Sequence, residues 1–237
     1  DSNLQGAAQE LGRLGYGEAE NGARRLAGIR GGNRYRQMPP AIRERFDALV
    51  PRLIEAAAET ANPDATLARG LDLLEAISRR AAYLALLQQY PQALQKVAQL
   101  VSASSWAASY LTRHPVLLDE LLDARLLEAA PDWAAFRAQL ARELDEHEPD
   151  TERQMDIMRE AHHAQVFRLL AQDLGGMLAL EKLSDHLSEL ADIMLDLALR
   201  LVWRKLLKRH REEPQFAVVA YGKLGGKELG YASDLDL

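Results

Sequence analysis

The chain has 237 residues, a formal net charge of −6 and 48% hydrophobic residues, and it contains no cysteine. This composition is typical of a soluble globular protein with one or two domains, and the absence of cysteine excludes disulfide bonds, cysteine-ligated zinc and thiol catalysis. The negative charge argues against nucleic acid as a partner, and no apolar run approaches the roughly 18 residues of a membrane span. Because the sequence opens at Asp1 without a signal-like segment, we expect an internal piece of a cytoplasmic protein.

Apolar residues recur at helical spacing through most of the chain, which predicts an all-helical bundle over residues 1–212. Pro51 predicts a kink or a break in its helix. Asn62-Pro63-Asp64 has the residues of a helix start, and Ser104 or Ser105 is expected to cap another helix. The helices expected in this part of the chain cover residues 4–14, 17–29, 41–60, 64–89, 91–100 and 105–112.

After a helix restart at Pro115, three longer helices are predicted. They cover residues 131–147, 150–174 and 178–210. The middle helix carries His162 and His163, and because adjacent residues point about 100° apart on a helix, we interpret this pair as packing rather than as a metal site. The basic end of the last helix, from Arg204 to Arg211, complements the helix dipole, with contact to a nucleotide as the alternative.

Residues 216–237 differ in pattern from the rest and hold the candidate chemistry. Phe216 to Tyr221 is a short apolar run with aromatic and β-branched residues, which predicts a buried strand. In the loop that follows, from Gly222 to Gly226, glycines permit positive φ and close approach of a ligand. The stretch Ser233-Asp234-Leu235-Asp236-Leu237 alternates, so a strand would place both carboxylates on one face.

Two carboxylates beside a glycine-rich loop suit Mg²⁺ bound together with a polyphosphate. Mg²⁺ takes oxygen ligands, typically one or two carboxylates plus phosphate oxygens. A pair of such ions would hold the attacking and leaving oxygens of an in-line displacement. A P-loop is excluded, because that motif requires Ser or Thr after Gly-Lys, and Gly222-Lys223 is followed by Leu224.

The order of strand, Gly-Gly loop and Ser-Asp-x-Asp resembles the nucleotidyltransferase superfamily related to DNA polymerase β. The longer string GKLGGKELG from Gly222 to Gly230, followed by Ser233-Asp234-Leu235-Asp236, is similar to one family in it, the bacterial glutamine synthetase adenylyltransferases. Members of that family carry two related halves, of which one attaches AMP to glutamine synthetase and the other removes it. Ala220-Tyr221 and Gly230-Tyr231-Ala232 are more similar to the attaching half.

The resemblance implies a mainly α fold in which residues 213–237 begin an α/β nucleotidyltransferase domain. It implies ATP as substrate, Mg²⁺ held by Asp234 and Asp236, a tyrosine of glutamine synthetase as acceptor, and the PII signalling protein as a regulator. The family's third carboxylate would lie beyond Leu237. The residues implied at the nucleotide are Gly222, Lys223, Gly225, Gly226 and Ser233.

Two other functions remain open at this point. The chain could belong to the removing half, which releases AMP by phosphorolysis on the same carboxylates. It could also be a helical module that binds a regulatory protein and has no activity of its own.

Overall fold

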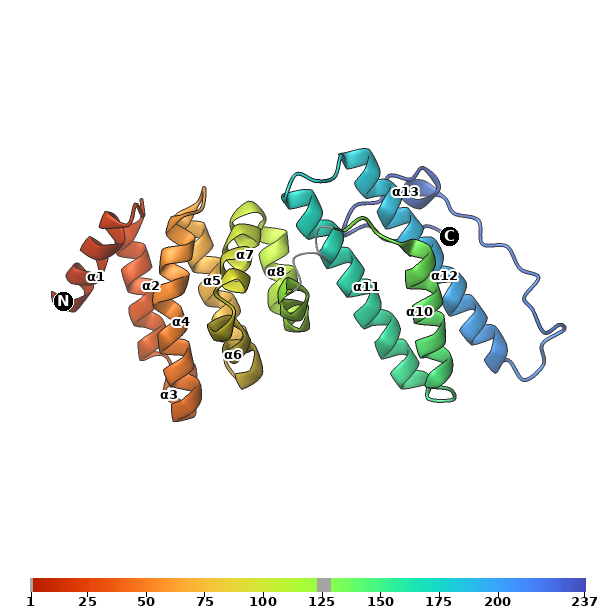
Figure 1. Ribbon diagram of the computed structural model, residues 1–237, viewed down its shortest axis with the longest axis horizontal. Helices are drawn as coiled ribbons and strands as arrows, with labels where there is room; N and C mark the ends of the chain where they lie inside the picture. The colour runs from red at the N-terminus through yellow and green to blue at the C-terminus, as the bar shows by residue number, and fades with distance from the viewer. Residues whose placement is uncertain (1, 123–128) are drawn as a thin grey trace. The chain divides into compact units, whose positions relative to one another are not determined.

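A computed structural model describes residues 2–122 and 129–237 (Figure 1). The chain divides into two compact units, Asp1–Asp123 and Ala124–Leu237. Helices dominate both, and no strand forms within the described residues, so the mainly α fold is confirmed. The border predicted between residues 212 and 213 lies inside the second unit and stays a prediction.

The first unit is a series of short helices in which each packs on its neighbours. Helix α1 lies against α2, α4 against α5, and α7 against both α4 and α5, as Figure 1 shows. The centre of this unit is formed by leucines and aromatic side chains, with Phe46, Leu49 and Leu53 of α4 almost fully buried. The helices are α1 (Ser2–Arg13), α2 (Ala19–Gly31), α3 (Asn33–Arg36), α4 (Pro40–Ala58), α5 (Pro63–Ile77), α6 (Ala81–Gln89), α7 (Pro91–Ala103), α8 (Ser105–Arg113) and the 3₁₀ helix η1 (Pro115–Leu122).

Helix α4 continues through Pro51, so of the kink or break expected there, the break is not formed. Proline removes one hydrogen bond, the bond that an N–H at this position would donate to the Asp47 carbonyl. Pro51 itself is exposed, while Leu49 and Leu53 on either side of it are fully buried. Tertiary packing of the apolar face therefore outweighs the local preference of proline.

The single helix expected over residues 64–89 is wrong, because the chain forms two helices, α5 and α6, joined by a turn. The Ser78 hydroxyl donates to the Glu75 carbonyl at 2.7 Å, a local bond that competes with helix continuation. The turn lets Leu84 and Leu87 reach the core, where both are 0% exposed. The cap expected at Ser104 is confirmed, since its Oγ accepts the Ala107 N–H at 3.1 Å.

The second unit contains three longer helices that lie against one another, and a one-turn helix that follows them (Figure 1). Asp132 and Asp150 cap the first two helices with their carboxylates. The three helices enclose a core of Leu140, Leu144, Ile157, Ile193 and Leu197. The described helices are α10 (Trp133–Glu146), α11 (Thr151–Leu174), α12 (Leu180–Lys205) and α13 (Gly222–Gly225).

The segment after α12 differs most from expectation. The helix ends at Lys205 rather than near residue 210, and an extended chain leads to α13, as Figure 1 shows. The strand predicted from Phe216 to Tyr221 is not formed, and Phe216 and Tyr221 are 65% and 66% exposed. A strand needs a ladder of hydrogen bonds to a neighbour, and this segment has only a single backbone bond to residues 233–237 within the part of the chain described here.

Across residues 2–122 and 129–237, no helix combines the length and apolar character that crossing a bilayer requires.

His162 in α11 is exposed by surface area, and desolvation by the protein atoms around its imidazole still lowers its pKa below the usual 6.5. As pH falls below about 6.5, the unfolded chain takes up a proton that the folded unit resists, so the free energy of unfolding should decrease. We expect His162→Gln to flatten this slope between about pH 6.5 and 5, measured by thermal or denaturant unfolding. The exposed His210→Gln serves as control, and an unchanged slope in His162→Gln would contradict the assignment.

Candidate functional site

The glycine-rich stretch folds into one tight helical turn, α13, with its neighbouring residues. The N–H groups of Gly225 and Gly226 donate to the carbonyls of Tyr221 and Gly222, both at 3.0 Å. Leu224 is only 5% exposed, and it anchors the turn to the rest of the unit. The two N–H groups therefore close the turn in this conformation.

Gly222 and Asp236 are 14 positions apart in the chain and lie in contact. Gly222 has φ +52°, and a Cβ placed on it would lie 2.2 Å from Asp236 Oδ2. The Tyr221 N–H next to it donates to the Asp236 carbonyl at 2.9 Å. Only glycine permits this backbone conformation and this approach together, so the turn and the second carboxylate are held side by side.

Asp234 and Asp236 are exposed, and within the described residues their carboxylates form no hydrogen bond or ion pair. Carboxylate oxygens facing solvent beside a tight turn are the donors that a hard divalent cation prefers. No cluster of three or more His, Asp or Glu side chains that could hold a metal occurs in the described parts of the chain. The residues present thus fit a cation that takes two ligands from this segment and the rest from elsewhere.

The other residues predicted at the nucleotide, Lys223, Gly225 and Ser233, lie in or next to the segment from Gly222 to Asp236. Lys223 is exposed and its ammonium forms no ion pair within the described residues. A Cβ on Gly225 would lie 2.6 Å from the Ala220 carbonyl oxygen, so the turn has no room for a side chain there. Ser233 forms its hydrogen bonds with Gly230 and none with α13. Its Oγ accepts the Gly230 N–H at 3.0 Å, and its own N–H donates to the Gly230 carbonyl.

Two side chains that the sequence analysis did not select hold this segment on the helices. Tyr231 Oη donates to Asp173 Oδ2 on α11 at 2.9 Å, and Ser184 Oγ on α12 donates to the Leu229 carbonyl at 3.2 Å. Burial, followed by the bond to Asp173, raises the pKa of the Tyr231 hydroxyl, which keeps it protonated as a donor. Little in the sequence indicates these contacts, because a serine in a leucine-rich helix is readily interpreted as facing solvent.

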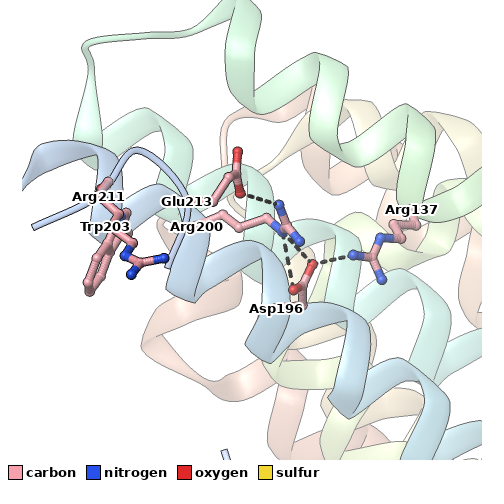
Figure 2. Close-up of polar contacts among 6 residues, drawn as sticks. All are labelled: Arg137, Asp196, Arg200, Trp203, Arg211 and Glu213. Atoms are coloured by element: carbon pink, nitrogen blue, oxygen red, sulfur yellow. Dashed lines mark hydrogen bonds and ion pairs between the residues drawn. The ribbon is translucent and has the colours of Figure 1, made fainter. Parts of the chain in front are cut away.

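The chain that enters the segment is fixed by an ion-pair network (Figure 2). Asp196 of α12 accepts hydrogen bonds from Arg137 of α10 and from Arg200, and Arg200 also reaches Glu213 at 3.1 Å. Near the same helix end, Trp203 Nε1 donates to the Arg211 carbonyl at 3.1 Å. The pairs are largely exposed, so each is expected to contribute roughly 1 kcal/mol or less, and their main effect is to fix the path of residues 211–213.

The basic end of α12 contacts its neighbouring helices. Arg204 pairs with Asp145 of α10 at 2.6 Å, and Lys205 donates to Thr151 and Gln154 of α11, also at 2.6 Å. These contacts support the structural interpretation of the basic end.

The second unit is thus a helical scaffold that carries a glycine-rich turn and two exposed carboxylates. Comparison with known proteins identifies the family: the model of the glutamate-ammonia ligase adenylyltransferases matches residues 94–237. The chain belongs to this family, as the resemblance in its motif implied.

Three curated relatives are similar over nearly the whole chain. Each is named bifunctional glutamine synthetase adenylyltransferase/adenylyl-removing enzyme. The protein from Aromatoleum aromaticum is 67% identical over 99% of this chain, that from Chromobacterium violaceum 57% over 98%, and that from Ralstonia nicotianae 54% over 100%. The chain spans about a quarter of the length of each relative, 25% or 26%.

Proposed function

We propose that this chain contributes to an enzyme that transfers AMP from ATP to a tyrosine of glutamine synthetase. The observation that carries the proposal is the contact between Gly222 and Asp236, which places an exposed carboxylate against a glycine-rich turn in a member of this family. Residues 213–237 are then the first part of an α/β nucleotidyltransferase domain, and residues 1–212 are the helical domain that supports it.

The reaction is an in-line displacement at the α-phosphorus of ATP. The tyrosine oxygen forms a bond to this phosphorus, the bond to the β-phosphate oxygen breaks, pyrophosphate leaves, and the tyrosine proton passes to solvent or a base. Asp234 and Asp236 would hold Mg²⁺, which when bound neutralises charge on the reacting phosphates. No other described side chain bonds to these exposed carboxylates, so their oxygens are available to a cation.

The turn gives this site its shape. Gly222, Gly225 and Gly226 keep side chains away from the nucleotide, and the Lys223 ammonium is available to a phosphate. Ser233 fixes the turn before Asp234 by its bonds with Gly230. Fixed geometry of this kind lowers the barrier by orienting the reacting groups before reaction.

The removal of AMP by phosphorolysis is the second candidate, because the names of the relatives include an adenylyl-removing activity. Ala220-Tyr221 and Gly230-Tyr231-Ala232 favour the attaching half, by resemblance. We also propose cytoplasmic glutamine synthetase as the protein substrate and a signalling protein of the PII type as regulator. Direct binding of PII to the intact protein tests the second partner.

The deciding experiment incubates the intact protein that carries this chain with glutamine synthetase and Mg²⁺, using ATP labelled at the α-phosphate or at the γ-phosphate. Label transferred from the α position alone supports AMP transfer. Label from the γ position indicates a kinase and overturns the proposal. If neither label is transferred, phosphate-dependent release of AMP from adenylylated glutamine synthetase would identify the removing activity.

A further inference from the structure

Resting on the proposed function, we infer that Asp173 of α11 and Ser184 of α12 are positioning residues, which hold the segment from Leu229 to Tyr231 and thereby set the place of Asp234 and Asp236. The inference concerns residues that lie 58 and 45 positions before Tyr231 and Leu229, the residues with which they bond.

The first support is the way this segment is attached. Leu229 is 5% exposed, and its carbonyl accepts the hydroxyl of Ser184, which is itself 8% exposed. Two residues later, Tyr231 donates to the Asp173 carboxylate at 2.9 Å. One anchor comes from each of two helices, so the segment is held at two points against rotation as well as against displacement.

The second support is the short path from these anchors to the carboxylates. Tyr231 lies inside the turn from Gly230 to Ser233, which is closed by a hydrogen bond in each direction at 3.0 and 3.1 Å. Asp234 follows this turn directly. With the turn closed, little freedom remains between the Tyr231 anchor and the first carboxylate.

The third support is the other end of the segment. Asp236 is held by its backbone bond to Tyr221 and by the close approach of Gly222. The stretch from Ser233 to Asp236 is therefore fixed at both ends, by α13 on one side and by the Tyr231 anchor on the other. Because no sheet pairs these residues in the described structure, the side-chain anchors supply the order that a strand ladder would otherwise give.

The test compares variants that remove one hydrogen-bonding group each in the intact protein. Tyr231→Phe and Asp173→Ala break the same bond from opposite sides, and Ser184→Ala breaks the other. Asp173→Asn keeps an acceptor oxygen and should retain most of the activity lost in Asp173→Ala. Tyr90→Phe and Asp185→Ala are the matched controls, since Tyr90 donates no side-chain hydrogen bond within the described residues and Asp185 forms an exposed pair with Lys182.

Two readouts are expected to change together. Amide hydrogen exchange over residues 229–236 should accelerate on the order of tenfold in Tyr231→Phe and Asp173→Ala. For AMP transfer, kcat should fall about ten- to hundredfold while KM for glutamine synthetase stays constant, because the reacting geometry is disturbed and protein binding is not. The double variant Tyr231→Phe/Asp173→Ala should lose no more than either single variant.

The outcomes separate this inference from the proposed function. Unchanged exchange and unchanged kcat in all three variants overturn the positioning role, even in an active enzyme. If the unsubstituted protein transfers no AMP, the proposed function fails, and the exchange measurement alone decides whether the anchors hold the segment. Loss of kcat in Asp173→Ala that Asp173→Asn does not restore would also contradict the inference.

Discussion

Asp236→Ala in the intact protein should abolish AMP transfer, with kcat falling roughly a thousandfold or more, while the helices stay folded. Removing a group that stabilises charge at the reacting phosphates typically costs a factor on the order of 10² to 10³, and here the loss of a metal ligand adds to it. Folding should be retained because the Asp236 carboxylate is exposed and bonds to no other described side chain. Asp234→Ala should behave alike.

The measurement is kcat with α-labelled ATP, alongside circular dichroism and the midpoint of thermal unfolding. Asp185→Ala, an exposed carboxylate on α12, controls for general loss of charge. Asp236→Asn retains the shape of the side chain but not its charge, and should be nearly as inactive as Asp236→Ala if the role is metal binding. A folded Asp234→Ala/Asp236→Ala protein with normal activity would disprove the metal assignment.

Gly222→Ala is expected to reduce AMP transfer at least about a hundredfold by displacing Asp236. The added Cβ would lie 2.2 Å from Asp236 Oδ2, so the carboxylate must move. A shift of about 1 Å at a reacting centre is enough for a loss of this size. Alanine at φ +52° also costs about 1–2 kcal/mol in conformational energy, which should appear as a modest decrease in stability of the second unit.

Two other glycines make the comparison specific. Gly225→Ala should be equally damaging, since its Cβ would lie 2.6 Å from the Ala220 carbonyl oxygen. This oxygen belongs to the backbone and cannot move aside by a change of side-chain rotamer. Gly230→Ala should be tolerated, because its nearest neighbour, Ser233 Oγ, is 3.7 Å away and its φ is not positive. Activity in these variants and in the unsubstituted protein is compared at equal folded fraction, and a fully active Gly222→Ala enzyme would contradict the role proposed for the contact between Gly222 and Asp236.

Much of the helical architecture follows from local chemistry. Serine before a helical pattern predicted the cap that Ser104 forms, the start of a helix was predicted at Asp150, and the apolar stripe of α12 predicted its burial. The single helix expected over residues 64–89 was wrong because long-range packing opposed a local preference, and the chain turns so that Leu84 and Leu87 reach the core. Helix α4 continues through Pro51, with buried leucines on both sides of it.

In the candidate site, too, local pattern predicted some features and contacts between distant residues produced the others. Alternation predicted Asp234 and Asp236 as a pair on one face of a strand, whereas the structure gives an extended segment with one backbone bond to Tyr221. Hydrogen-bond ladders are properties of two segments together, so no pattern within either one specifies them. The hydrogen bonds of Asp173 and Ser184 could not be predicted for the same reason, since their partners lie 58 and 45 positions away.

The family, the helical class and the string of glycines and carboxylates can be read from the linear order of residues, because spacing and residue type are preserved in it. The folded chain is needed to see that Gly222 lies against Asp236, that Gly225 has no room for a side chain, and that two helices bond to Tyr231 and Leu229. These are contacts between distant residues, and they depend on how the helices pack around a shared core.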